Sequence, residues 1–479
     1  MKFIIFGIGK YYLDHRDEMV TSMEPEDEIV GFIDNRVTKT EQFENRKLYP
    51  PEKITELVFD LVIVMSIDYL KEMMIQLRGL GIGNDRICCF REYVSRKMRG
   101  KMQFYKNACQ SQSSKRILII TEDLGYHGGA IAATYADRCL RLKGYNVCLV
   151  AQKGNMNFIK EIVKNGSTVL LMPALPYIDS EEMYFIQLYD VIVVNTFLMI
   201  SVAKKINEYK PVLWWIHEGS ATYTSVYQNT IKQFPECDAI DWMESVNILA
   251  VSNIAKRNFE LFYPGTIKGL MSYGISDYYD GVNAPSDNDN IVFAIIGYIY
   301  PLKGQDIFLR AVSNLQGLRE HGEFLIIGQM GDDETYTKEI LNLSAKLPEV
   351  KCKGMLDRGE IRKMFSQIDV LVCASLEDSL PIVVTEAMMY GKVCIVTDNI
   401  GHTGLICDKK NGLVCKSGDV DSLCEKMRWV ITHRNSLPQI GKKARRTYEQ
   451  YFTMNKFGDV LERNVLMTEE LWKQRISDI

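Results

Sequence analysis

The stretch VLVCASLEDSLPIVVTEAMMYGKVCIVT, residues 370–397, combines a strand, a loop, a helix and a second strand. Its apolar runs, Val370–Ala374 and Val393–Thr397, predict buried parallel strands. Pro381 suits the start of a helix, because its missing N–H would be unpaired there, and Gly391 suits the helix end. The free N–H groups after Pro381 and the positive end of the helix dipole favour a diphosphate.

Two acids belong to the same stretch. Asp378 lies in the loop before the helix, and Glu386 lies about one turn inside it. A carboxylate such as that of Glu386 accepts two hydrogen bonds from a vicinal diol such as ribose. Asp378 is placed to reach a sugar hydroxyl on the other side of the phosphates. A ligand that carries this diphosphate is also expected to contact Leu380, Ile382 and Val383. The alternative is a surface loop followed by a helix-capping acid.

Outward from this stretch, short β-branched runs alternate with longer amphipathic ones, which is typical of βαβ units. Strands are expected at Val191–Asn195, Val212–Ile216 and Ile291–Ile296. We therefore expect an α/β fold of two facing Rossmann-like domains preceded by a small additional Rossmann-like α/β domain. The expected parts are residues 1–95 (accessory domain), 96–114 (linker), 115–280 (acceptor domain), 285–450 (donor domain) and 451–479 (a C-terminal helix that crosses back to the acceptor domain).

A second motif, GYIYPLKGQD at residues 297–306, follows the strand expected at Ile291–Ile296. A lysine just past a strand end, here Lys303, can reach a leaving diphosphate. There it would neutralise the charge that grows as a glycosidic bond breaks. Tyr298 in the same turn is assigned to the donor site. The alternative is an ordinary loop lysine.

Two further segments follow predicted strands. In GYHGGA, residues 125–130, the glycines (Gly128 and Gly129 among them) allow close backbone approach to an anionic or oxygen-rich group. In WWIHEG, residues 214–219, His217 stands at the end of a strand and faces the expected cleft. It would bind a sugar hydroxyl or position the acceptor. The alternatives are a plain turn and a structural histidine.

At these motifs the chain resembles the retaining glycosyltransferases of the family 4 type, which have the GT-B fold and an acid-x7-Glu donor motif. The resemblance covers roughly residues 115–465. It implies that Glu386 binds the nucleotide ribose and that Asp378 contacts the donor sugar. It also implies that Gly128 and Gly129 bind the donor. Relatives usually have Glu at the first acid position, and they pair the lysine with an arginine near the position of Tyr298. Both differ here.

The resemblance adds residues that spacing alone would not single out. Gly354 and Met355 lie where the family lines its nucleobase pocket with backbone. Gly401 and His402 lie where relatives carry a glycine loop beside the donor. Each of these four residues is therefore expected to bind the donor.

The resemblance also implies a reaction: transfer of a hexosyl group from a UDP- or GDP-linked sugar with retention of configuration. The acceptor hydroxyl would attack from the front face, and the departing phosphate would serve as base. The expected acceptor is a glycan or lipid-linked hydroxyl in surface polysaccharide or glycoconjugate synthesis. No cofactor and no metal are expected, and Asp287-Asn288-Asp289 is interpreted as a turn. The competing hypothesis is a non-catalytic transferase-like subunit that binds an acceptor or a partner transferase.

Composition restricts the setting. The chain has 479 residues, a formal charge of −4 and twelve cysteines. This balance gives no reason to expect nucleic acid as a partner. The cysteine usage, with no stretch of about 18–20 apolar residues, predicts a cytoplasmic protein. Basic residues in 96–114 interleave with Met102, Phe104 and Tyr105. They predict either a solvated linker or peripheral contact with the inner face of a membrane.

The start of the chain carries a partial nucleotide fingerprint. A predicted strand, Phe3–Phe6, is followed by Gly7 and Gly9, and Asp34 ends the next predicted strand. The glycines would admit a phosphate and Asp34 would meet a ribose, but Tyr12 occupies the place of the third glycine. Two hypotheses stay open: a structural or regulatory domain, and a working nucleotide site.

Overall fold

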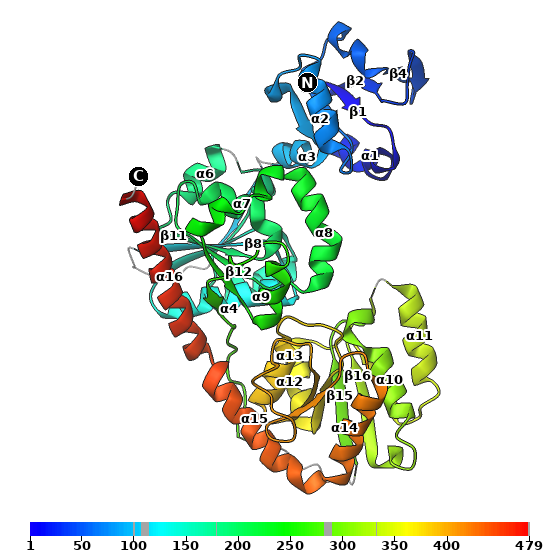
Figure 1. Cartoon of the computed structure of the whole chain (residues 1–479), viewed down its shortest axis with the longest axis vertical. Helices are drawn as coiled ribbons and strands as arrows, with labels where there is room; N and C mark the ends of the chain where they lie inside the picture. Colours follow the sequence, from blue (N-terminus) through cyan, green and yellow to red (C-terminus); the bar gives the residue numbers. More distant parts are fainter. Residues whose placement is uncertain (99–100, 107–114, 179, 282–289, 332, 478–479) are drawn as a thin grey trace.

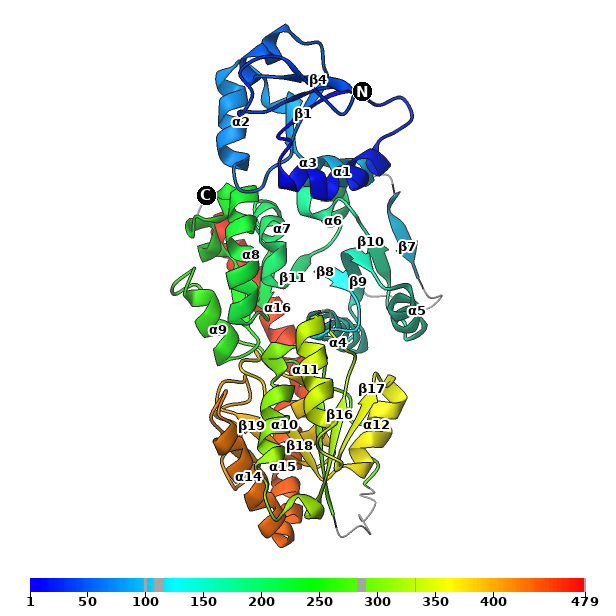
Figure 2. The ribbon, with the colours of Figure 1, turned by 90° about the vertical axis from the view of Figure 1, so that its right-hand side faces the viewer.

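The structure is a computed structural model that describes residues 1–98, 101–106, 115–178, 180–281, 290–331 and 333–477. Within these residues the strands form three mainly parallel sheets. Figure 1 shows the corresponding α/β bodies in chain order along the long axis, and Figure 2 shows the same order from the side. We call them the N-terminal body (residues 1–98), the central body (residues 101–281) and the C-terminal body (residues 290–453). The predicted α/β class is confirmed.

The N-terminal body has strand order β3-β4-β2-β1-β5-β6, and only the β3–β4 pair is antiparallel. Apolar strands such as Leu61–Val64 are fully buried, because helices cover both faces of the parallel sheet. Its strands are β1 (Lys2–Phe6), β2 (Glu28–Ile33), β3 (Glu41–Phe43), β4 (Arg46–Tyr49), β5 (Leu61–Val64) and β6 (Ile87–Cys89), and its helices are α1 (Lys10–Ser22), α2 (Leu70–Gly79) and α3 (Phe90–Met98).

The central body has strand order β14-β13-β12-β11-β8-β9-β10-β7. Its strands are β7 (Gln103–Tyr105), β8 (Arg116–Leu124), β9 (Asn146–Gly154), β10 (Val169–Leu171), β11 (Val191–Asn195), β12 (Val212–Ile216), β13 (Asn247–Ala250) and β14 (Gly269–Leu270). Its helices are α4 (Gly128–Leu142), α5 (Met156–Lys164), α6 (Ser180–Ile186), α7 (Ile200–Ile206), α8 (Ser220–Gln233) and α9 (Asn253–Glu260). Strand β7 lies within the expected linker, where it pairs antiparallel with β10 at the sheet edge.

The C-terminal body has strand order β17-β16-β15-β18-β19-β20, and all of its strand pairs are parallel. Its strands are β15 (Ile291–Ile296), β16 (Gly322–Ile327), β17 (Val350–Gly354), β18 (Val370–Cys373), β19 (Val393–Thr397) and β20 (Leu413–Cys415). Its helices are α10 (Gln305–Ser313), α11 (Glu334–Ser344), α12 (Arg358–Gln367), α13 (Ile382–Met389), α14 (Val420–Thr432) and α15 (Leu437–Tyr451).

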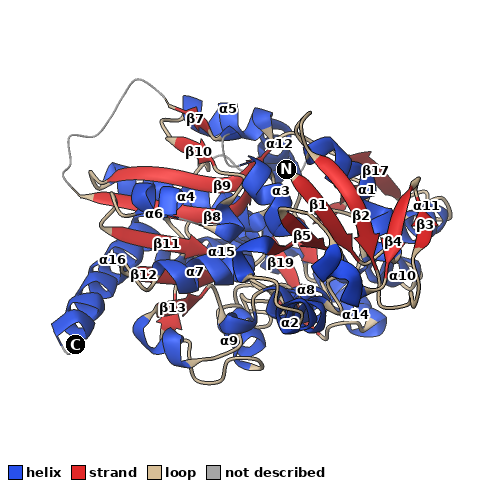
Figure 3. Cartoon of the chain, turned by 90° about the horizontal axis from the view of Figure 1, so that it is seen from above, coloured by secondary structure: helices blue, strands red, loops and turns tan. Residues whose placement is uncertain are grey.

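The last helix, α16 (Met454–Ser477), leaves the C-terminal body and packs on the central one. Figure 1 shows it in red alongside the central body, and Figure 3 shows it beside β11 and β12. Phe457 stacks on Trp215 with ring centroids 5.4 Å apart. The Asn247 amide donates to Thr468 Oγ1 at 2.9 Å. This helix therefore joins the two larger bodies along one side.

The loops at the carboxyl ends of the central and C-terminal sheets meet. Ser252, which follows β13, donates from its hydroxyl to the carbonyl oxygen of Ser379, which follows β18, at 2.5 Å. Tyr273 donates to the carbonyl oxygen of Leu380 at 2.7 Å. Ligands of open parallel sheets bind beyond these strand ends, so this meeting line is where a site is expected.

Candidate active site

Helix α13 begins at Ile382, directly after Pro381. Among the described residues, no side chain caps this helix start, and Ile382 and Val383 are partly exposed. The first N–H groups of a helix have no intrahelical partner and lie at the positive end of its dipole. The start of α13 therefore offers hydrogen-bond donors and positive potential to an anion.

Lys303 lies beside Asp378 because of one glycine. Lys303 ends the short turn Pro301–Lys303, and Gly304 follows with a left-handed φ of 68°. A Cβ on Gly304 would collide with the carbonyl oxygen of Ala374, so only glycine lets this turn pack so closely against the end of β18. Lys303 Nζ then lies 2.5 Å from Asp378 Oδ2.

This ion pair is only partly open to solvent, since the Lys303 and Asp378 side chains are 28% and 14% exposed. Burial opposes the charge on Lys303, but the attraction and hydrogen bond of Asp378 outweigh it and raise the pKa of the lysine. Lys303 is therefore a fixed cation in the loops that precede α13. A fixed cation is what a leaving diphosphate requires.

Glu386 projects from α13 and pairs with Arg358, the first residue of α12. Arg358 Nη1 lies 3.6 Å from Glu386 Oε1, and the two side chains are 35% and 20% exposed. A capping box between Asp357 and Glu360 fixes the start of α12 and thereby the position of Arg358. Burial raises the pKa of Glu386, and the positive charges of Arg358 and Arg362 oppose that rise.

Glu386 also lines a cavity of about 130 Å³ between the two larger bodies. Arg358 contributes to the cavity from the C-terminal body, and Tyr135 and Glu161 contribute from the central body. Lys303 is not among its lining residues. The structure thus places Glu386, but not Lys303, in a space that both bodies enclose.

The glycine loop of the central body leads directly into α4. Gly128 is the first residue of this helix, is exposed, and has open space where a Cβ would stand. Gly129 packs close to the Thr196 methyl group, 3.4 Å from where its Cβ would be. The preceding His127 is held by Asp123, with Nε2 to Oδ1 at 2.5 Å. The loop therefore has exposed backbone at Gly128, and donor binding there stays a prediction.

His217 follows β12 with its ring edge-on to Trp215, at a centroid distance of 4.3 Å. Its Nε2 has no hydrogen-bond partner among the described residues. Burial lowers the pKa of His217 to about 3, so the imidazole is neutral at pH 7. A neutral ring has one nitrogen that donates and one that accepts, which suits a sugar hydroxyl.

Glu218 anchors the loop that carries His217. Its carboxylate accepts from the backbone N–H groups of Phe197 at 2.7 Å and His217 at 2.9 Å. Burial raises the pKa of Glu218 to about 7, although these backbone hydrogen bonds oppose the rise. The His217 loop therefore rests on a carboxyl group that titrates near neutral pH.

Gly401 and His402 have different positions relative to α13. The N–H of Gly401 donates to the carbonyl oxygen of Asp378 at 2.9 Å. His402 is fully buried, with Nε2 2.9 Å from Thr385 Oγ1 and its ring 5.2 Å from that of Phe452. The His402 side chain is thus enclosed in the core, where it supports α13. The backbone of this loop lies beside Asp378.

The other predicted donor residues are spread around these loops. Tyr298 is 40% exposed, and its carbonyl oxygen accepts from Gln305 at 3.1 Å. Gly354 ends β17 with a φ of 68°, and the following Met355 is 65% exposed. Leu380 is 7% exposed. Gly354 and Met355 therefore leave backbone and side chain open at the end of β17, whereas Leu380 is part of the packing.

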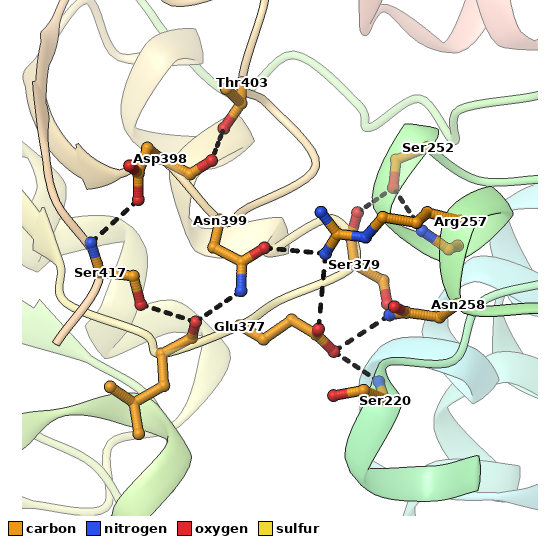
Figure 4. Close-up of polar contacts among 12 residues, drawn as sticks. Ser220, Ser252, Arg257, Asn258, Glu377, Ser379, Asp398, Asn399, Thr403 and Ser417 are labelled. Carbon is orange, nitrogen blue, oxygen red and sulfur yellow. Dashed lines mark hydrogen bonds and ion pairs between the residues drawn. The ribbon is translucent and has the colours of Figure 1, made fainter. Parts of the chain in front are cut away.

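Glu377 joins the two larger bodies, a role that the sequence did not reveal. Its Oε1 accepts from the N–H of Ser220 at 2.5 Å and from Asn258 Nδ2 at 3.1 Å, and its Oε2 lies 3.8 Å from Arg257 Nη2 (Figure 4). A Cβ on Gly219 would lie 2.7 Å from Glu377 Oε1, so a larger residue there would push the Glu377 carboxylate aside. Because Glu377 adjoins Asp378, this contact fixes the loop that carries the Lys303 partner.

Neither a cluster of metal ligands nor a helix suited to cross a membrane is found among the described residues. No group of three or more His, Cys, Asp or Glu side chains is arranged there to hold a metal ion. No helix in those ranges combines the length and apolar character needed to cross a membrane. The segment Asp287-Asn288-Asp289, interpreted as a turn, lies outside the described residues.

Family models match successive parts of the chain. The model "Glycosyl transferases group 1" matches residues 282–447, which include Lys303, Asp378 and Glu386. The model "Glycosyl-transferase family 4" matches residues 113–249, which include the glycine loop and His217. The model "C2185-like, N-terminal" matches residues 1–88.

Curated relatives match over limited lengths. The phosphatidylinositol N-acetylglucosaminyltransferase GPI3 subunit of Saccharomyces cerevisiae is 23% identical over 192 residues, which are 38% of this chain and 41% of the relative. The UDP-Gal:alpha-D-GlcNAc-diphosphoundecaprenol alpha-1,3-galactosyltransferase of Escherichia coli is 26% identical, over 28% of this chain and 35% of the relative. The matches thus span less than half of these two relatives.

Solved structures match over more of the chain. Anabaena HepE, solved in complex with UDP and glucose, has a TM-score of 0.63 and 16% identity, and the match covers 74% of this chain and 100% of HepE. Sucrose-phosphate synthase of Thermosynechococcus elongatus has a TM-score of 0.58 and 15% identity, over 76% of this chain and 100% of that one. The fold and the matched models together support a glycosyltransferase with the GT-B fold, and the predicted fold is confirmed. More narrowly, the group 1 model covers most of the C-terminal body, and the family 4 model covers the central body as far as residue 249.

Proposed function

We propose that this protein transfers a hexosyl group from a nucleoside diphosphate sugar to a hydroxyl of a glycan or lipid-linked acceptor, with retention of configuration and without a metal. The observation that carries the proposal is the Lys303–Asp378 ion pair in the loops that lead to the uncapped start of α13. Glu386 stands about one turn further along the same helix. The N–H groups at the start of α13 and the Lys303 ammonium group suit the phosphates of a nucleotide. The Glu386 carboxylate, one turn further along, suits the ribose next to those phosphates.

The donor would be held by parts of the C-terminal body. Its diphosphate would accept hydrogen bonds from the N–H groups of Ile382 and Val383 and would be neutralised by Lys303. Its ribose would be bound by Glu386, which then exchanges part of its pairing with Arg358 for two hydroxyl donors. The nucleobase would lie at the open end of β17, beside Gly354 and Met355.

The reaction would take place where the two larger bodies meet. The bond between the anomeric carbon and the donor phosphate oxygen breaks, and the acceptor oxygen bonds to the same face of that carbon. The acceptor proton passes to the departing diphosphate. Lys303 stabilises the charge on the leaving group, and Asp378 accepts a hydrogen bond from a hydroxyl of the donor sugar. Neutral His217 would orient a sugar hydroxyl, with Glu218 holding its loop.

The class of donor and acceptor is proposed from the named relatives. HepE was solved with UDP and glucose, which supports a UDP-linked donor here, with a GDP-linked donor as the other choice. The two curated relatives are named for phosphatidylinositol and diphosphoundecaprenol acceptors, which supports a lipid-linked acceptor and a role in glycoconjugate synthesis.

We place the protein in the cytoplasm, at the inner face of a membrane. Near the edge strand β7, Met102 is 45% exposed and Phe104 is 58% exposed, and the exposed Lys101 and Lys106 lie close to them in sequence. Exposed apolar side chains among lysines suit the surface of an anionic bilayer, where a lipid-linked acceptor would be presented.

The test is release of nucleoside diphosphate from a panel of UDP- and GDP-linked hexoses, with lipid-linked and free glycan acceptors. The wild-type protein should turn over one donor, and Lys303→Ala and Glu386→Ala should each lose activity by orders of magnitude. Lys338→Ala and Glu334→Ala are matched controls, because this pair is 71% and 84% exposed on α11. Absence of turnover with every donor and acceptor would instead favour a non-catalytic transferase-like subunit. The feature of the sequence that fits this alternative is Tyr298, because the resemblance implies an arginine near that position.

A further inference from the structure

A cavity of about 710 Å³ lies in the N-terminal body, at the carboxyl ends of β1, β2 and β5. In the strand order, β2 and β5 flank β1 on opposite sides, so the chain reverses its direction of winding there. Such a switch point is where open parallel sheets bind ligands. The volume lies in the range of about 300–1,000 Å³ that is typical of small-molecule sites.

One wall of this cavity is suited to a phosphate. Gly7, with a φ of 97°, and Gly9 line it, and a Cβ on Gly9 would meet nothing within 4 Å. Gly9 precedes the thirteen-residue helix α1, whose start is not capped by any side chain in the part of the chain that the structure describes. The neighbouring Lys10 is exposed and lines the same cavity. Unpaired N–H groups, a helix dipole and an ammonium group therefore surround one end of the space.

Arg36 is a second cation that lines the cavity, and its contact with Asp34 changes the predicted role of that acid. Both Asp34 oxygens accept from the Arg36 guanidinium, at 2.8 Å and 3.0 Å, and Oδ2 also accepts from the Ile8 N–H at 3.0 Å. Burial alone would raise the pKa of Asp34, but these hydrogen bonds lower it. The expectation that Asp34 meets a ribose is therefore corrected: its oxygens already hold Arg36. The Arg36 side chain is 66% exposed, with guanidinium N–H groups left for a ligand.

The same cavity also offers side chains suited to a flat ring. Met65, Met73, Tyr11 and Tyr69 line it, and they supply aromatic faces and thioethers. Asn229 of α8 also lines the cavity, so the central body closes a space that the N-terminal body opens. Phosphate-binding groups, apolar rings and an amide that can pair with a base edge are thus gathered around one volume.

The same geometry argues against a dinucleotide. Tyr12 stands where the fingerprint requires a third glycine, is 2% exposed, and donates its hydroxyl to Glu44 Oε2 at 2.6 Å. A third glycine lets the helix approach the strand closely, and the buried Tyr12 ring fills that place. We propose that the cavity of the N-terminal body binds a mononucleotide, with its phosphate at the start of α1 between Lys10 and Arg36 and its base against Met65 and Tyr69. This site lies on a different sheet from the donor site and does not depend on the transferase proposal.

The test uses the full chain with Lys303→Ala and Glu386→Ala, so that the proposed donor site makes no contribution. AMP, GMP, CMP, UMP and inorganic phosphate are titrated separately by calorimetry. At least one nucleotide should bind at one equivalent and at least tenfold more tightly than inorganic phosphate. Adding Gly9→Asp should weaken this binding at least tenfold, because the new carboxylate caps α1 and repels phosphate.

The variant is expected to fold, since Gly9 has an ordinary φ of −76° and Asp is a favoured residue before a helix. Lys10→Glu is a second variant with the same expected loss. Gly79→Asp adds the same charge at an exposed position with open space around it, and should leave binding unchanged. The proposal fails if no nucleotide binds, if phosphate alone binds as tightly as the nucleotides, or if Gly9→Asp and Lys10→Glu bind like the parent.

Discussion

Lys303 Nζ and Asp378 Oδ2 lie 2.5 Å apart, although 75 positions separate the two residues in the sequence. Each follows a different strand of the C-terminal sheet, and the turn at Gly304 brings them together. The pair places one positive and one negative charge in the loops before the start of α13. In the proposed reaction Lys303 neutralises the phosphates, and Asp378 accepts a hydrogen bond from the donor sugar.

Replacing Lys303 with Met removes the ammonium group but keeps most of the side-chain volume. We expect kcat to fall by about 10²–10³-fold, the usual cost of removing one group that stabilises charge in a transition state. Steady-state release of the nucleoside diphosphate measures it. Lys338→Met, on the exposed face of α11, is the control and should keep full activity. An unchanged kcat in Lys303→Met would remove this lysine from the chemistry.

Arg358 is expected to set the pH range of donor binding. Burial raises the pKa of Glu386 and Arg358 lowers it, so Arg358→Ala should raise that pKa further. Donor binding requires ionised Glu386, so affinity should weaken as pH falls through this pKa. The midpoint of that weakening should move to higher pH in Arg358→Ala, measured by calorimetry with the nucleoside diphosphate from pH 5 to 8.

Two variants control this measurement. Glu386→Gln cannot ionise and should bind weakly without this pH dependence. Arg310→Ala removes a half-exposed arginine on α10 and should leave the midpoint in place. A midpoint that is equal in the wild type and in Arg358→Ala would contradict the assigned role of Glu386.

Glu377→Gln should loosen the contact between the two larger bodies. The carboxylate accepts from the Ser220 N–H and from Asn258, and hydrogen bonds to a charged group contribute about 1.5–3 kcal/mol. We expect faster amide exchange at the start of α8 and a similar loss in the free energy of unfolding. Glu323→Gln changes an acid on β16 that pairs with Lys351, and should not affect α8. Unchanged exchange at Ser220 in Glu377→Gln would show that other contacts hold the bodies together.

Glu218 predicts a pH dependence of stability. Its pKa rises from 4.5 to about 7 on folding, because burial disfavours the charge. Between these values the folded state keeps a proton that the unfolded state releases, so this group makes stability fall as pH rises through the window. The full effect is at most about 3 kcal/mol, at about 1.36 kcal/mol for each pKa unit.

Glu218→Gln removes this titration, so the stability of the variant relative to the wild type should increase from pH 5 to pH 8. Urea unfolding at several pH values measures the difference. His217 adds an opposite trend below its unfolded pKa of 6.5, but this is common to both proteins and cancels. A difference that stays constant with pH would mean that Glu218 does not titrate in this range.

Apolar runs were the reliable signal for the fold. Strands β11 and β15 have the predicted bounds, Val191–Asn195 and Ile291–Ile296, because buried parallel strands read as continuous apolar sequence. Strand β17 was not predicted, because its sequence VKCKG carries two lysines and does not form an apolar run. The strand tolerates these lysines because it lies at the edge of the sheet and pairs on one side only. Strand β7 lies in the expected linker for a similar reason: it is short and forms only at the sheet edge.

The candidate site was predictable one loop at a time. The motifs identified these residues separately: Lys303 and Asp378 lie in loops that follow strands, and Glu386 lies about one turn inside α13. The partners that tune them come from tertiary packing: Arg358 reaches Glu386 from another helix, and Glu377 reaches across to the central body. No local pattern encodes such contacts.

The most direct test of the central claim is a crystal structure of the protein with UDP or GDP. The account predicts the diphosphate within hydrogen-bond distance of the Ile382 and Val383 N–H groups and of Lys303 Nζ, with the ribose hydroxyls on Glu386. A nucleotide bound only in the N-terminal cavity, or with its phosphates away from the start of α13, would contradict it.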